Sequence, residues 1–270
     1  MNYDLIWING MPRSGTSWLS QIIASSEEVN FKMAPLFSHQ FKDKVDENSS
    51  KDQWVNFFDE VFITKDFFIN QEERKNKGEF MNFQKLKNQK FLCVKDVRYH
   101  EVIPTLLNHF GEIKIIHIVR NPCATIYSWM NTKKEFKVNE NTTENEWLTG
   151  KTRKINKSEY WGFNDWVSLT KHYLILQKKY RKNVYLVSYE DLVDNTNAEV
   201  NKLFEFCDIK ANEQTQEFLR LSHEKHDEND YSVFKNVSQV KSKWKENLDS
   251  EIANQIIQTC KNEGLEFYLK

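Results

Sequence analysis

The segment from residue 10 to residue 18 holds the side chains best suited to bind an anion. Gly10 and Gly15 let the backbone bend and come close to a bound oxyanion. A short apolar run precedes this turn and an apolar helical pattern follows it. The start of the helix therefore presents unpaired N–H groups and the positive end of its dipole. The side-chain donors are Arg13, Ser14, Thr16 and Ser17. These features predict a cradle for a phosphate-like group.

This turn differs from the phosphate loop of nucleoside triphosphatases. In that motif, G-x-x-x-x-G-K-[ST], a lysine follows the second glycine and reaches the terminal phosphates. Gly10 and Gly15 keep the glycine spacing, but Thr16 stands in the place of the lysine and the cation has moved to Arg13. We expect an anion site that works without the usual magnesium–nucleotide arrangement. The alternative is an ordinary strand-to-helix turn in which two glycines coincide by chance.

A second cluster of chemically active side chains follows the apolar run at residues 91–94. It reads Lys95-Asp-Val-Arg-Tyr-His-Glu101. Ligands of open α/β sheets bind at the carboxyl ends of strands, so this cluster lies where chemistry is expected. Lys95 can stabilise a developing negative charge, while Asp96, His100 or Glu101 could act as a general base. A purely structural role is equally open for Asp96, because it is also suited to be a helix N-cap.

A third cluster follows the next apolar run, residues 114–119. Arg120 leaves the end of this predicted strand, and Asn121 and Pro122 are suited to cap and begin a helix. Ser128 lies two helical turns further on. Arg120 and Ser128 could together hold a second phosphate, well away from the first. His117 lies inside the run and is interpreted as a core histidine.

Composition limits the classes of partner. The 270 residues contain 38 lysines and arginines against 39 aspartates and glutamates, so no global field favours nucleic acid or an anionic membrane. The pattern of the N-terminal residues argues against a signal peptide, and no apolar run has the roughly 20 residues of a membrane span. The four separated cysteines are expected to be small buried residues rather than a zinc site or a disulfide framework. A cytoplasmic soluble enzyme with a small anionic ligand is expected.

The remaining pattern predicts the elements that must position these clusters. Apolar runs at residues 91–94, 114–119 and 184–188 are typical of buried parallel strands, and amphipathic helices are expected at 51–68 and 161–180. Segments 29–43, 131–160 and 231–245 are expected to be irregular. The second of these is a candidate lid over the site, and the third mixes cations with aromatic residues and has no clear period. We expect one α/β domain over residues 1–270, with a central parallel β-sheet flanked by helices.

Taken in order, these motifs resemble those of sulfotransferases that use 3′-phosphoadenosine 5′-phosphosulfate. Met11–Trp18 is similar to the family's 5′-phosphosulfate loop, and Ile118–Ser128 to its 3′-phosphate motif. Ser188–Leu192 is similar to the strand end whose tyrosine contacts the adenine, and Phe234–Trp244 to the C-terminal loop over the cofactor phosphates. The resemblance implies a three-layer fold like that of P-loop nucleoside triphosphatases. It implies cofactor contacts by Arg13, Ser14, Gly15, Thr16, Ser17, Trp18, Arg120, Ser128, Tyr189, Lys235 and Trp244.

The implied reaction is sulfuryl transfer without a metal, to a hydroxyl or, less favoured, an amine of a small metabolite or carbohydrate. Such transfer requires positioning and charge stabilisation more than covalent chemistry. The predicted catalytic residues are Arg13, Lys95, Asp96 and His100. Two features depart from the family: many members have lysine where Arg13 stands, and cytosolic members often have Lys-x-His where Lys95 is followed by Asp96 and Val97. The base therefore stays open among Asp96, His100, Glu101 and His39, with Asp96 ahead on position.

Two other functions compete with this hypothesis. A P-loop nucleotide or small-molecule kinase would bind Mg-ATP, but Thr16 replaces the lysine that such an enzyme needs. A catalytically silent nucleotide-binding module would keep Arg13, Arg120 and Ser128 without a working base.

Overall fold

Five strands form one parallel sheet in the computed structural model, which describes the chain except residues 137–144, 226, 228–231 and 235–236 and the side chains of 237–239. The strands are β1 (Asp4–Gly10), β2 (Val29–Met33), β3 (Phe91–Lys95), β4 (Lys114–Val119) and β5 (Val184–Ser188). Their order across the sheet is β2-β3-β1-β4-β5, and every neighbouring pair is parallel. The predicted central parallel sheet is confirmed.

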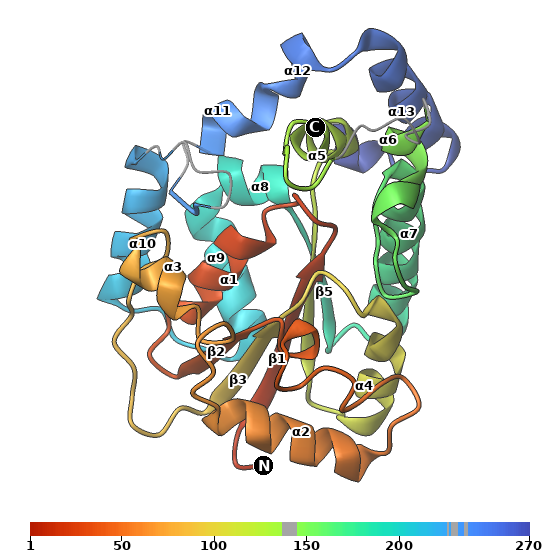
Figure 1. The fold of residues 1–270 in the computed structure, drawn as a ribbon. Coiled ribbons are helices and arrows are strands. Elements are labelled where there is room, and N and C mark those ends of the chain that lie inside the picture. The colour runs from red at the N-terminus through yellow and green to blue at the C-terminus, as the bar shows by residue number, and fades with distance from the viewer. Residues whose placement is uncertain (137–144, 226, 228–231, 235–236) are drawn as a thin grey trace.

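Helices cover both faces of the sheet, because residues along each strand alternate between two hydrophobic cores. Leu5 and Trp7 of β1 belong to one core, and Ile6 and Ile8 to the other. In Figure 1, α1, α9 and α10 lie to the left of the sheet and α7 to the right, which gives the three layers. The helices of the first half are α1 (Thr16–Ala24), α2 (Lys51–Ile63), α3 (Glu72–Asn76), α4 (Ile103–His109) and α5 (Pro122–Met130). Those of the second half are α6 (Glu146–Thr149), α7 (Phe163–Lys179), α8 (Tyr189–Asp194), α9 (Thr196–Cys207), α10 (Glu213–Glu224), α11 (Val237–Ser242), α12 (Trp244–Asn247) and α13 (Ser250–Asn262).

The register of the strands brings the three predicted clusters to one edge of the sheet. Lys95 at the end of β3 is paired with Ile8 of β1, and Gly10 at the end of β1 is paired with Ile118 of β4. Val119, the last residue of β4, is paired with Ser188 at the end of β5. The turn after β1 and the residues after β3, β4 and β5 therefore meet at the carboxyl edge, where open α/β folds bind ligands.

The prediction of an irregular segment over residues 29–43 is wrong in its first part, since Val29–Met33 forms the edge strand β2. The polar residues of this segment interrupt the apolar pattern by which the other strands were predicted. Lys32 is buried because its ammonium donates to the Thr64 carbonyl at 3.0 Å and to Asn70 Oδ1 at 2.8 Å. The segment 231–245 is also more regular than predicted, since it contains α11 and the start of α12. Residues 137–144 of the candidate lid lie outside the described residues, so the lid stays a prediction.

Candidate active site

The turn after β1 has the backbone geometry of an anion cradle. Arg13 and Gly15 both have left-handed backbones, with φ of 70° and 88°. Position 15 requires glycine, because a Cβ there would lie 2.6 Å from Cδ2 of Tyr189. The first helical N–H groups, from Gly15 to Trp18, have no acceptor within the described part of the chain. These donors are therefore available to an anionic ligand.

Arg120 ties the motif after β4 to this turn. Its Nη1 donates to the carbonyl of Arg13 at 3.0 Å, and its Nη2 donates to the carbonyl of Val240 at 3.0 Å. Its guanidinium lies 4.8 Å from the centre of the Tyr189 ring. The Nε of this buried arginine meets no acceptor among the described residues. A buried donor without an acceptor is a good candidate to bind a ligand.

A cavity of about 300 Å³ lies between these two motifs. Its walls are Arg13, Gly15, Thr16, Ser17, Trp18, Arg120, Tyr127, Ser128, Asn131, Thr132, Tyr189, Ser232, Val233, Val240 and Lys243. We call it the cofactor cavity. It is cationic on two sides, with Arg13 and Arg120 and with the N-terminus of α1.

The two anion-binding motifs contact each other directly. Nε of Arg13 donates to Oγ of Ser128 at 3.2 Å, so the turn and α5 form one continuous wall. This contact joins the two motifs without placing the two phosphates, so their separation stays a prediction. The arginine is long enough to cross the gap, which spacing along the sequence does not reveal.

A second cavity, of about 470 Å³, opens beside the end of β3. Met33, Ala34, Phe37, Phe67, Phe68 and Val97 give its apolar lining, and Ser17, Gln71, Glu73, Arg74, Lys77, Glu79, Lys95, Asp96 and Arg98 give its polar lining. We call it the acceptor cavity. Ser17 lines both cavities, so they meet at the first turn of α1.

The Lys95–Asp96 pair forms the polar floor of the acceptor cavity. Asp96 is fully buried, and its Oδ1 accepts a hydrogen bond from the Arg98 N–H at 3.0 Å. Its Oδ2 has no partner among the described residues. Burial raises the pKa of Asp96 to about 6 and lowers the pKa of Lys95 to about 8. Asp96 is thus poised to accept a proton near neutral pH, and no helix begins on it, which removes the N-cap interpretation.

Charged residues on the rim of the acceptor cavity are paired. The Arg74 Nε lies 3.1 Å from Glu79, and the Lys77 ammonium lies 2.5 Å from Glu73. Arg98 lies 3.4 Å from Glu159 and stacks 4.0 Å from the centre of the Phe37 ring. This rim therefore offers little unbalanced charge to a bound molecule.

Comparison with known proteins assigns the family. The model of the sulfotransferase family matches residues 6–213, which include both anion-binding motifs and the floor of the acceptor cavity. The chain belongs to the sulfotransferase family. No curated protein matches this sulfotransferase.

Solved structures share the fold of this sulfotransferase at low sequence identity. Mouse sulfotransferase SULT7A1, complexed with PAP, is 15% identical with a TM-score of 0.57, over 98% of this chain and 87% of its own. The sulfotransferase domain from the curacin biosynthetic pathway is 15% identical with a TM-score of 0.52, over 96% and 98% of the two chains. Retinol dehydratase, in a complex with retinol and PAP, is 11% identical with a TM-score of 0.57, over 97% and 82%.

Most of the predicted cofactor contacts of this sulfotransferase line the cofactor cavity. Ser14 does not: it is buried, and its hydroxyl has no partner among the described residues. Trp244 packs against the hydrophobic core instead, and Lys243 lines the cavity in its place. Lys235 lies outside the described residues. Asn131 and Thr132, which follow directly on the end of α5, also line this cavity and were not predicted.

His100, predicted as a candidate base, lines neither of the two cavities. Its Nδ1 lies 2.8 Å from the hydroxyl of Tyr173, whose ring stacks on His117 with centroids 3.6 Å apart. His117 Nδ1 in turn lies 2.7 Å from Asn9 Oδ1, as expected of a core histidine. Burial lowers the pKa of His100 to about 3. This group is a structural network of the interior, which spacing after the strand end could not distinguish from a site.

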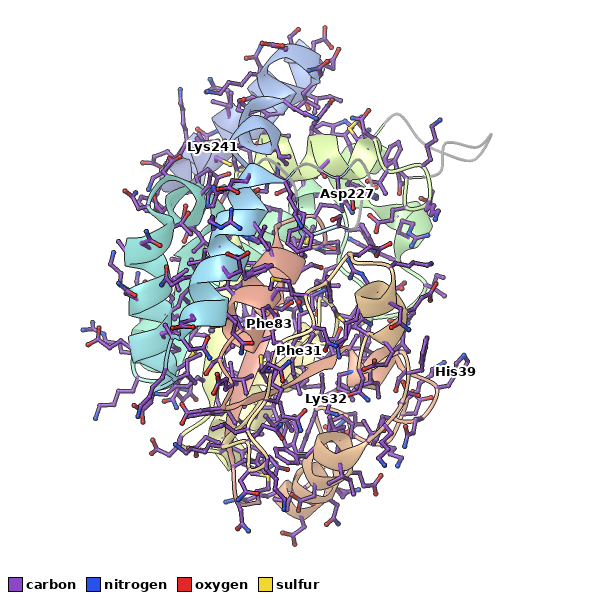
Figure 2. All side chains as sticks on the ribbon, turned by 90° about the vertical axis from the view of Figure 1, so that its left-hand side faces the viewer. Phe31, Lys32, His39, Phe83, Asp227 and Lys241 are labelled. Carbon is purple, nitrogen blue, oxygen red and sulfur yellow. The ribbon has the colours of Figure 1, made fainter. Side chains whose placement is uncertain are left out.

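The other two candidate bases also lie away from both cavities. His39 is exposed on an outward loop, at the right edge of Figure 2. Glu101 accepts hydrogen bonds from Ser158 and Tyr160. Among the candidates, only Asp96 lines the acceptor cavity.

No group of three or more His, Cys, Asp or Glu side chains in the described part of the sulfotransferase is arranged to hold a metal ion. Its described helices include none with the length and apolar content of a membrane span. All four cysteines are buried and free, as predicted.

Proposed function

We propose that this sulfotransferase moves a sulfuryl group from 3′-phosphoadenosine 5′-phosphosulfate to a hydroxyl of a small metabolite or carbohydrate, in the cytoplasm. The observation that carries the proposal is the meeting of the two cavities at Ser17. Transfer between two bound molecules needs their reacting atoms side by side, and contiguous cavities provide this. One of these cavities is cationic and the other ends on a buried carboxylate.

The residues of the cofactor cavity fit a doubly phosphorylated nucleotide. The N–H groups from Gly15 to Trp18 and the Nε of Arg120 are donors without acceptors in the described chain, and each can bind a phosphate oxygen. The 5′ group would be held by the turn and Arg13, and the 3′-phosphate by Arg120 and Ser128. Tyr189 would contact the adenine. When bound, the cofactor supplies the activated sulfuryl group.

Three residues have chemical roles in the proposed reaction. Asp96 removes the proton from the attacking hydroxyl, because this residue lines the acceptor cavity and its buried Oδ2 has no partner among the described residues. Lys95 and Arg13 stabilise the negative charge that develops on the oxygen of the departing phosphate. Their positive charges are most effective where protein, rather than water, surrounds the reaction.

The acceptor cavity favours an uncharged molecule with an apolar or ring-shaped body. Phe37, Phe67 and Phe68 are 47%, 57% and 44% exposed, which is unusual for residues of this size. Rings of this kind stack on flat apolar faces. A carboxylate or phosphate on the acceptor would find the rim cations already paired. We therefore expect a neutral alcohol, phenol or sugar, and a hydroxyl rather than an amine.

Thermal denaturation with different nucleotides tests the cofactor assignment. Adenosine 3′,5′-bisphosphate (PAP), at about 100 times its Kd, should raise the Tm by roughly 5–10 °C. ATP with magnesium should raise the Tm by less at the same concentration, because it lacks the 3′-phosphate. Stabilisation by Mg-ATP alone would instead favour a kinase. Stabilisation by PAP without sulfuryl transfer to any neutral alcohol, phenol or sugar would favour a silent binding module.

A further inference from the structure

A carboxylate is held beside a cation of the proposed transfer site. Glu135 lies in the turn that follows α5, where its N–H donates to the Thr132 carbonyl at 2.8 Å. The next residue, Phe136, also bonds to that carbonyl, at 2.9 Å, and packs edge-on against Trp129 with centroids 5.0 Å apart. The backbone position of Glu135 is therefore fixed by the core and by the wall of the cofactor cavity.

Glu135 forms an ion pair with Arg13, which lines the cofactor cavity. Its Oε2 lies 3.9 Å from the Nε of Arg13, with side chains only 18% and 15% exposed. The carboxylate therefore lies at the arginine that would meet an anionic ligand.

We propose that Glu135 is an internal counter-ion, which neutralises Arg13 until the 5′ end of the cofactor takes its place. A poorly solvated cation without a counter-ion is costly, so the carboxylate stabilises the ligand-free site. A phosphosulfate or phosphate bound to Arg13 would repel the Glu135 carboxylate. Cofactor binding must therefore displace Glu135 from Arg13, and this displacement weakens the affinity. The inference rests on the proposed function.

Affinity measurements on Glu135→Gln test this exchange. Removing the charge removes the competitor, so we expect PAP to bind about tenfold more tightly, which corresponds to an electrostatic interaction of ordinary size. Adenosine 3′-monophosphate, which lacks the 5′ group, should bind within about twofold of its wild-type affinity. A tighter complex is informative because a merely damaged site would bind PAP more weakly.

The matched control is Glu246→Gln, which removes the same charge from an exposed position of α12 and should leave both affinities unchanged. Unchanged PAP binding by Glu135→Gln would overturn the inference, and weaker binding would overturn it and indicate that Glu135 holds Arg13 in place in the complex. If the wild type does not bind PAP at all, the proposed cofactor is wrong. Inorganic pyrophosphate, measured in the same series, then decides the role of Glu135, since its binding should tighten in Glu135→Gln and should not if the inference is wrong.

Discussion

The two cavities that meet at Ser17 differ in whether their charged and polar groups have partners. In the cofactor cavity, the Nε of buried Arg120 and the first N–H groups of α1 lack acceptors within the described chain. On the rim of the acceptor cavity, Arg98 and Lys77 each have a carboxylate partner, and three phenylalanines are exposed. Unmet donors are costly to bury unless a ligand completes them, whereas the paired charges on this rim leave little net charge to attract a charged ligand. The contrast supports the proposal of one strongly anionic substrate and one neutral substrate.

Replacement of Asp96 should have the largest effect. Asp96→Asn keeps the shape of the floor but cannot accept a proton, so kcat should fall by roughly 10²–10⁴-fold. The affinity for PAP should stay within about twofold, because Asp96 lines only the acceptor cavity. Steady-state kinetics and isothermal titration measure the two effects. Full turnover in the variant would show that another group is the base.

The pH dependence of kcat/KM should be bell-shaped. Asp96 is an effective base only when deprotonated, so activity should rise as the pH passes its pKa of about 6. Lys95 supplies a positive charge only when protonated, so activity should fall above its pKa of about 8. A pH–rate profile checks both limbs. The cation of arginine does not titrate in this pH range, so the activity of Lys95→Arg should no longer fall at alkaline pH. If it still falls, the group that loses its proton there is not Lys95.

Arg120 and Arg98 test the contrast in charge directly. Arg120→Ala removes a charge-assisted phosphate contact, and PAP affinity should fall by roughly 10–100-fold. Arg98→Ala, in the acceptor cavity, should change PAP affinity by less than about twofold. Equal losses in the two variants, measured by titration, would mean that the cavities do not divide their ligands as proposed.

The exposed phenylalanines should have the smallest effect, confined to the acceptor. Phe68→Ala should raise the KM for a neutral ring-bearing acceptor by roughly 3–10-fold, because about 1 kcal/mol of apolar contact is lost. The affinity for PAP should not change. Phe267→Ala, which removes an exposed ring near the C-terminal end of the described chain, is the control. A change in PAP affinity with constant acceptor KM would reverse the assignment of the two cavities.

The cofactor cavity was largely predictable from the sequence, whereas the acceptor cavity was not. The residues that bind the anion follow directly on strand ends, so the order of the strands brings Gly15, Arg120 and Tyr189 together. The acceptor cavity draws its walls from β2, from the segment after α2 and from β3, and β2 itself was missed. Whether a buried residue after a strand end faces a cavity depends on its side-chain partners, which the sequence does not show. His100 and Asp96 are both buried and lie close in sequence, but only Asp96 faces a cavity.

The central place of β1 in the sheet also has a consequence for how the protein folds. This N-terminal strand pairs only with β3 and β4, which lie far along the chain, and both pairings are parallel. Non-local parallel pairing has a large entropic cost of loop closure and forms slowly. We therefore expect the turn after β1 to reach its native shape only once β3 and β4 have paired with β1. Cofactor-binding capacity should thus appear late in refolding, after the local helices.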